Sequence, residues 1–488
     1  MSGNSNVRFS GTRRDFLKQA AATAMVSMAA GARAQGESPA RTKPNIVIFI
    51  ADQFRADFVH ANNENPTTVT PNLDRVALHG TNFNHCVTNQ PLCTPSRGCL
   101  FTGRYATQTG TWKLGLGFEP GVKTIADVVR AHGYTANYIG KWHLANFDFK
   151  TGQGEKGFVT PEGRGGFNDL WEASNVLEST SEPYKGTLWS GDGKPIYYEG
   201  IYRTEFLTDL ATRFLKQEHR DPFLLVISQL EPHQQNDMRA FIPPTGYEEQ
   251  FKNPFVPHDL RPFPGNWYSQ LPGYYGDVKA VDESVGAVLQ TLKEQKILED
   301  TIFVFVSDHG NHFKTRNGEY KRSAHDASIR IPLLMQGPNL NDGGVIEDIV
   351  SMIDVAPTIL DAAGISAPEV MDGRSMMPLV NKDPARENWR EEAYIQISSS
   401  MTARAIRTTE WTYCAVDPDS VPNGDNPYGK SYRDYQLYNN AADPAQIINL
   451  AGRYDHKKVL SGFRDQLEQW LKDVGEPVVP IGRASFYP

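Results

Sequence analysis

Four short apolar runs rich in β-branched residues constrain the fold of this chain more than any other feature of its sequence. They cover residues 45–50, 134–139, 223–228 and 301–306. Continuous apolar runs of this length are typical of parallel strands that are buried on both faces. An amphipathic helical pattern over residues 277–296 separates the last two runs. The sequence therefore predicts an α/β fold built on a mostly parallel central sheet.

Charged or metal-binding residues closely follow each of the four runs. These residues are Asp52 and Gln53, Lys141 and His143, His233, and Asp308 and His309. Open α/β sheets bind ligands at the carboxyl ends of their strands. One buried strand followed by an aspartate carries little information, but four such strands together indicate a polar site along one edge of the sheet.

A cysteine lies where a helix is expected to begin, within residues 91–104. Cys93 stands just before Pro95, a favoured residue at the start of a helix. The N-terminus of a helix stabilises anions and thiolates, and Arg97 follows within one turn. The stretch is thus a candidate anion site with a potential nucleophile. A buried cysteine in an ordinary turn is the alternative interpretation.

Residues 91–104 resemble the sulfatase signature Cys-x-Pro-Ser-Arg followed by Leu-x-Thr-Gly-Arg, in which the cysteine is oxidised to formylglycine. Other segments resemble further sulfatase motifs: residues 133–143, which end in Gly-Lys-Trp-His, the metal loops at 45–53 and 307–310, residues 321–332, and residues 438–450. The resemblance covers about residues 43–475. It implies an alkaline-phosphatase-like sandwich with helices on both faces of the sheet. It also implies a catalytic domain over residues 35–385 and a small C-terminal α+β subdomain over residues 386–488.

The metal loops depart from the usual sulfatase pattern. Gln53 replaces the commoner second aspartate, and His309 stands where asparagine is frequent. Asp-Gln and Asp-His loops occur in a branch of the family that includes phosphonate monoester and phosphodiester hydrolases as well as sulfatases. The resemblance therefore implies a sulfuric ester hydrolase, with a phosphonate monoester or phosphodiester hydrolase as the alternative. An exported, non-catalytic binding protein of the same fold is a third hypothesis.

The resemblance also implies a metal site and a modified cysteine. The ligands would be Asp52, Gln53, Asp308 and His309, together with the side chain made from Cys93. Carboxylate and amide oxygens suit Ca²⁺, the usual ion of the family, and one imidazole also admits Mn²⁺. A formylglycine-generating enzyme would be the partner that converts Cys93.

The remaining motif residues are expected to act on the ester. Arg97 and Lys141 would neutralise charge on the nucleophile and on the sulfuryl oxygens. Lys321 and His233 would stabilise and protonate the leaving oxygen. His143 would deprotonate the second hydroxyl of the hydrated aldehyde, so that sulfate is expelled.

Residues 1–34 have the pattern of an export signal. Arg13 and Arg14 precede an uncharged stretch, and Ala32-Arg33-Ala34 forms a small-x-small cleavage site. Paired arginines in this position are typical of the twin-arginine pathway. We therefore expect a twin-arginine translocase as a partner and a periplasmic or secreted protein. No later run approaches the ~20 apolar residues of a membrane helix, so we expect no membrane span.

The net charge and the number of cysteines argue against certain partners, substrates and fold classes. The net charge is −8, which argues against nucleic acid as a bulk electrostatic partner. A surface of this sign would also repel a densely sulfated polymer, so we expect a small sulfated substrate: first a mono- or oligosaccharide, and second a simple aryl or alkyl sulfate. Four cysteines are too few for a disulfide scaffold. Cys86 and Cys99 could still pair in an oxidising compartment.

Overall fold

An eleven-stranded sheet forms the centre of the protein, for which a computed structural model describes residues 43–341 and 343–485. The strand order is β13-β2-β12-β10-β1-β9-β4-β5-β7-β6, and β8 pairs with β7. Five adjacent central strands are parallel: β10 (Thr301–Ser307), β1 (Asn45–Ala51), β9 (Phe223–Ser228), β4 (Thr135–Lys141) and β5 (Trp171–Ser174). The four predicted strands are four neighbours in this central group. The expected signal peptide, residues 1–34, lies outside the described residues.

The outer strands make the sheet mixed rather than uniformly parallel. They are β2 (Thr81–Phe83), β12 (Leu333–Gln336), β13 (Gly344–Ile346), β6 (Ser181–Glu182), β7 (Lys185–Ser190) and β8 (Pro195–Glu199). All their pairings are antiparallel except that of β13 with β2. Antiparallel neighbours can be joined by short turns, whereas each parallel pair needs a longer crossover.

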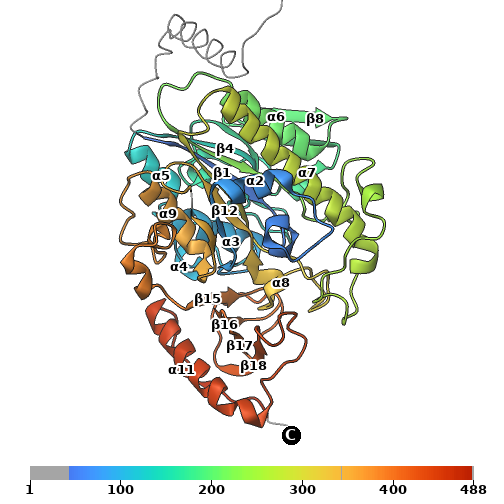
Figure 1. The fold of residues 1–488 in the computed structure, drawn as a ribbon, viewed down its shortest axis with the longest axis vertical. Helices are drawn as coiled ribbons and strands as arrows, with labels where there is room; N and C mark the ends of the chain where they lie inside the picture. The colour runs from blue at the N-terminus through green and yellow to red at the C-terminus, as the bar shows by residue number, and fades with distance from the viewer. Residues whose placement is uncertain (1–42, 342, 486–488) are drawn as a thin grey trace, which may run out of the picture. The chain divides into compact units, whose positions relative to one another are not determined.

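Helices cover both faces of the sheet (Figure 1). The side chains of β1 alternate: Ile46 and Ile48 belong to one core and Val47 and Phe49 to the other. The first core includes α3 (Cys93–Thr102), α5 (Ile125–Ala131) and α9 (Val355–Ala362). The second core includes α2 (Pro71–His79), α6 (Arg203–Leu215) and α7 (Trp267–Glu294). The predicted α/β class, with helices on both faces, is confirmed.

A second sheet follows in the C-terminal part of the chain. It contains β15 (Glu392–Ile397), β16 (Ala403–Thr408), β17 (Trp411–Val416), β18 (Tyr432–Asn439) and β19 (Ile481–Gly482). Helix α11 (Lys457–Asp473) lies beside this sheet and buries Leu460, Phe463 and Leu467 (Figure 1). The buried face of α11 belongs to the same core as α3 and α5, so this sheet and helix pack on the central domain.

Short elements complete the described structure. A three-stranded sheet consists of β11 (Arg330–Ile331), β3 (Cys86–Val87) and β14 (Val350–Ser351). The short helices are α4 (Ala106–Thr109), α8 (Asp326–Ile329) and α10 (Met377–Val380). Cys86 and Cys99 are both free and buried, so they do not pair. Across the described residues, no helix combines the length and the apolarity that a bilayer crossing requires.

Candidate active site

The pairing of two strands brings the two predicted metal loops together. Strands β1 and β10 are parallel and in register, with Ala51 opposite Ser307. Asp52 and Asp308 are the next residues, so their carboxylates leave the sheet side by side. The backbone N–H of Gln53 donates to Asp308 Oδ1 at 3.1 Å. Gln53 adopts a left-handed backbone conformation, with φ of 69°, a strained geometry that is common at functional sites.

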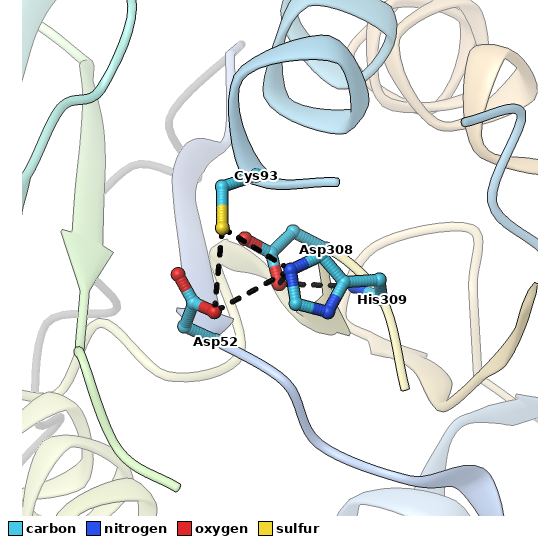
Figure 2. A group of neighbouring side chains, drawn as sticks. All are labelled: Asp52, Cys93, Asp308 and His309. Atoms are coloured by element: carbon cyan, nitrogen blue, oxygen red, sulfur yellow. Dashed lines mark hydrogen bonds and ion pairs between the residues drawn. The ribbon is translucent and has the colours of Figure 1, made fainter. Parts of the chain in front are cut away.

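Cys93 faces these loops from the first residue of α3 (Figure 2). Its Sγ lies 3.2 Å from His309 Nε2 and 3.8 Å from Asp52 Oδ1. One possible ligand atom from each of Asp52, Cys93, Asp308 and His309 lies within 4.8 Å of the others. All four side chains are buried, and Cys93 is only 2% exposed. The cluster joins residues that are far apart in the sequence into one small polar centre.

The charges of the cluster favour a bound cation. Burial and the nearby Asp52 raise the pKa of Asp308 above its usual value. Burial also opposes the ionisation of Asp52, but Lys141 and Lys321 hold its pKa below its usual value. Two buried carboxylates this close repel each other, and a divalent cation between them would offset that repulsion. Their oxygens and the His309 imidazole form a donor set that both Ca²⁺ and Mn²⁺ accept.

Arg97 is enclosed behind the cluster. Its Nε donates to Asp308 Oδ2 at 3.1 Å, and its Nη2 donates to Asp52 Oδ2 at 3.2 Å. Its Nη1 donates to Ser228 Oγ and to the backbone oxygen of Lys141. The guanidinium therefore acts directly on the two carboxylates, which it holds in place and partly neutralises.

Two lysines lie next to the cysteine and the carboxylates. Lys141 Nζ donates to Asp52 Oδ2 at 2.8 Å. Lys321 Nζ donates to Gln53 Oε1 at 3.1 Å and lies 3.2 Å from Cys93 Sγ. Burial opposes the ionisation of the Cys93 thiol, yet the two lysines hold its pKa well below its usual value. An anion at position 93 is thus strongly stabilised.

The two predicted histidines lie at the same edge of the sheet. His143 follows β4, is buried, and has a left-handed φ of 62°. Its Nδ1 lies 3.6 Å from a carboxylate oxygen of Glu178. His233 follows β9 and is buried, and its Nδ1 lies 2.7 Å from the backbone oxygen of Gln234. The contacts described above therefore connect the other predicted site residues, from Asp52 to Lys321, whereas His233 contacts the neighbouring Gln234.

Several residues at this centre lie outside the motifs of the sequence. Glu178 contacts Lys141 and His143, and Gln234 Oε1 accepts a hydrogen bond from Gln53 Nε2 at 2.9 Å. Glu178 lies in a single 3₁₀ turn and Gln234 in a loop, both of ordinary composition, so nothing in the sequence marks them. In contrast, His325 and Asp326, which stand in a motif-like segment, contact Tyr438 and Arg407 and lie outside the cluster.

Comparison with protein families identifies two matching regions. A model of the sulfatase family matches residues 44–365. A model of the C-terminal region of N-sulphoglucosamine sulphohydrolase matches residues 318–473. An ulvan-active sulfatase from Formosa agariphila is 29% identical over 454 residues, which cover 89% of this chain and 82% of that protein.

Solved structures share the fold of nearly the whole chain. A protein solved in complex with its substrate D-glucosamine-2-N,6-O-disulfate has a TM-score of 0.74 at 23% identity, over 89% of this chain and 98% of that one. The phosphonate monoester hydrolase of Agrobacterium radiobacter has a TM-score of 0.68 at 20% identity, over 88% of this chain and 96% of that one. At these identities the similarity establishes the fold.

Proposed function

Because the chain belongs to the sulfatase family, whose members hydrolyse sulfate esters, we propose that it cleaves a small sulfated saccharide with the help of one divalent cation and a formylglycine made from Cys93. The observation that carries the proposal is the buried cluster of Asp52, Cys93, Asp308 and His309. Two similar proteins support a sulfated saccharide: one is named an ulvan-active sulfatase, and the other was solved in complex with its substrate D-glucosamine-2-N,6-O-disulfate.

The residues of the cluster fit both absent groups. Asp52, Asp308 and His309 would hold the cation, with Gln53 Oε1 as a further oxygen donor. A cation bound there would supply positive charge to polarise the sulfuryl group, and a hydrated aldehyde at position 93 would supply the nucleophilic hydroxyl. The position of Cys93, at the N-terminus of α3 and beside two lysines, favours negative charge at that atom.

Each of the surrounding side chains then has its own role in the reaction. Lys141 and Lys321 neutralise charge that develops around the sulfuryl group. His233 protonates the leaving oxygen, and Lys321 stabilises it. His143 accepts a proton at a ring nitrogen when sulfate is released. Arg97 keeps the two carboxylates in position throughout.

A cavity on the far side of Glu178 from Lys141 has an acidic lining, which favours a small substrate with few sulfate groups. The cavity has a volume of about 710 Å³, and Glu178, which contacts Lys141, is one of its lining residues. The other charged residues in its lining are Glu182, Lys185, Glu199 and Asp237. Carboxylates therefore outnumber the single lysine, and their repulsion would disfavour anionic groups of a substrate that extends into this cavity.

Two measurements test this function. Mass spectrometry of the Cys93 peptide, after expression with a formylglycine-generating enzyme, should find an aldehyde in place of the thiol. Values of kcat/KM should then be higher for sulfated mono- and disaccharides than for the intact polysaccharide. An intact thiol in fully active protein, or faster turnover of the polysaccharide, would overturn the proposal.

The Asp-Gln and Asp-His loops favour a second candidate, a phosphonate monoester or phosphodiester hydrolase. Comparison of kcat/KM on an aryl sulfate and on the matching aryl phosphonate monoester decides between the two. A preference for the sulfate supports the first function, and a preference for the phosphonate supports the second.

Export is part of the proposal. Residues 1–34, with Arg13 and Arg14, would direct the folded protein through a twin-arginine translocase to the periplasm or the medium. Replacing both arginines by lysine should leave the precursor in the cytoplasm, as fractionation and immunoblotting would reveal. Unchanged export of that variant would contradict the assignment.

A further inference from the structure

Glu178 is a carboxylate at the active site that none of the sequence motifs contains. It lies in the 3₁₀ helix η4 (Leu177–Ser179), shortly after β5. Strand β5 is parallel to β4, with Ser174 opposite Lys141. The pairing continues past the strand end, because the N–H of His143 donates to the backbone oxygen of Asn175 at 2.8 Å. The backbone thus fixes the Glu178 loop beside the loop that carries Lys141 and His143.

The Glu178 side chain points toward the reaction centre rather than toward solvent. Only 7% of the side chain is exposed. Its Oε1 accepts a hydrogen bond from Lys141 Nζ at 3.2 Å and lies 3.6 Å from His143 Nδ1. Its Oε2 is buried and has no hydrogen-bond partner among the described residues. A buried carboxylate oxygen that lacks a partner is costly, which favours a role beyond a simple ion pair.

The first role concerns Lys141. Its other carboxylate partner is Asp52, whose Oδ2 is shared with Arg97. A divalent cation held by Asp52 would compete with Lys141 for the negative charge of that carboxylate. Lys141 would then depend on Glu178, because a buried ammonium group without a counter-charge is strongly disfavoured.

The second role concerns His143. Both of its ring nitrogens are buried and lack hydrogen-bond partners within the described part of the chain. A small rotation of the ring would let Nδ1 donate to Glu178, and Nε2 would then be left as a proton acceptor. The partner of one ring nitrogen sets the state of the other, so Glu178 would select the form of His143 that the reaction needs.

From these contacts we propose that Glu178 is a positioning residue of the sulfatase reaction, which holds Lys141 and orients His143. The inference rests on the proposed function, which gives Lys141 and His143 their catalytic roles. Burial opposes the ionisation of Glu178, but Lys141 and His143 lower its pKa to about 2. The carboxylate therefore remains charged throughout the pH range in which the enzyme would be assayed.

Three substitutions test the role. Glu178→Gln keeps the shape and removes the charge, and Glu178→Asp keeps the charge on a shorter side chain. Glu172→Gln is the matched control, because Glu172 lies on β5, the strand that leads to Glu178, but pairs with Arg213 away from the centre. We expect Glu178→Gln to lower kcat by ~30-fold or more with KM changed by less than about threefold. Glu178→Asp should recover a large part of kcat, and Glu172→Gln should keep the wild-type kcat.

A double-mutant cycle separates positioning from a structural role. If Glu178 acts through His143, Glu178→Gln should cost less than about fivefold in the His143→Ala background. Rates are measured on whichever aryl ester, sulfate or phosphonate, the wild type hydrolyses, so failure of the saccharide assignment does not affect this test. Melting temperature, metal content and formylglycine content are measured for every variant. The proposal is overturned by a kcat loss below threefold, by equal losses in both backgrounds, or by a loss that follows missing metal or formylglycine.

Discussion

Replacing Asp308 by asparagine should weaken cation binding while the protein remains folded. Asp308 Oδ1 accepts hydrogen bonds from the backbone N–H groups of Gln53 and His309, at 3.1 and 2.9 Å. Its Oδ2 accepts from Arg97 Nε at 3.1 Å. The asparagine oxygen can keep the two backbone bonds, so the variant loses mainly the bond to Arg97. A charge-assisted bond of this kind contributes ~1.5–3 kcal/mol, and typical domains have about 5–15 kcal/mol of stability, so the variant should fold.

Cation binding should respond far more strongly than folding. Asp308 and Asp52 carry the only carboxylates of the four-residue cluster, so the substitution removes half of its negative ligands. A cation at 100 times its dissociation constant stabilises the folded protein by ~2.7 kcal/mol. The melting temperature of the wild type should therefore rise by several degrees in Ca²⁺ or Mn²⁺. Asp308→Asn should show no such rise, and its turnover should fall at least ~100-fold.

The assay is differential scanning fluorimetry with and without chelator, together with metal analysis of dialysed protein. Asp282→Asn is the matched control, because Asp282 also accepts backbone N–H bonds, from Asn72 and Leu73, on a helix outside the cluster. The control should keep the cation-dependent rise in melting temperature, whatever its own stability. Stoichiometric metal and an unchanged rise in Asp308→Asn would refute the ligand assignment.

Three further predictions address the nucleophile, the general acid and the pH dependence of stability. Cys93→Ala should abolish turnover while circular dichroism shows an intact fold; more than a few per cent of wild-type activity would exclude the nucleophilic role. His233→Ala should lose far more rate on a sugar sulfate than on nitrophenyl sulfate, whose leaving group needs little protonation; equal losses on both would remove His233 as the general acid. Burial lowers the pKa of His312 to about 3, below its ordinary 6.5, so the unfolded chain binds a proton that the folded chain does not. Stability should therefore fall as the pH drops from about 6.5 toward 3, by up to ~1.4 kcal/mol per pH unit for this group, and urea titrations should find a flatter dependence in His312→Gln.

The strands and their polar ends could be predicted from the sequence because both are local signals. An apolar run followed by Asp52 or Asp308 is visible in a few residues, and the parallel arrangement then brings such ends together. The partners of a buried charged side chain cannot be predicted in the same way. Arg97 pairs with two carboxylates because β1 lies beside β10, and no local sequence pattern encodes that strand pairing.

Helix α7 illustrates how packing overrides local signals. Sequence analysis places its start near Asp277, whereas it begins at Trp267 and includes Pro272. Glycine disfavours a helix interior, so Gly273 alone argues against a helix at this position. In the structure, a Cβ at Gly273 would lie 2.5 Å from the backbone oxygen of Phe241, so the glycine permits a close approach that stabilises the helix. Glu178 was missed for a related reason, since only the three-dimensional fold places it beside Lys141.

The position of β1 in the middle of the sheet also sets the order of events during protein synthesis. The loop after β1 completes its contacts only with a segment 255 residues further along the chain. Until that segment leaves the ribosome, one edge of a largely apolar strand has no partner, and exposed edges of this kind promote aggregation. The site is thus completed only after more than half of the chain has been made, and we expect folding to be slow and dependent on holding chaperones.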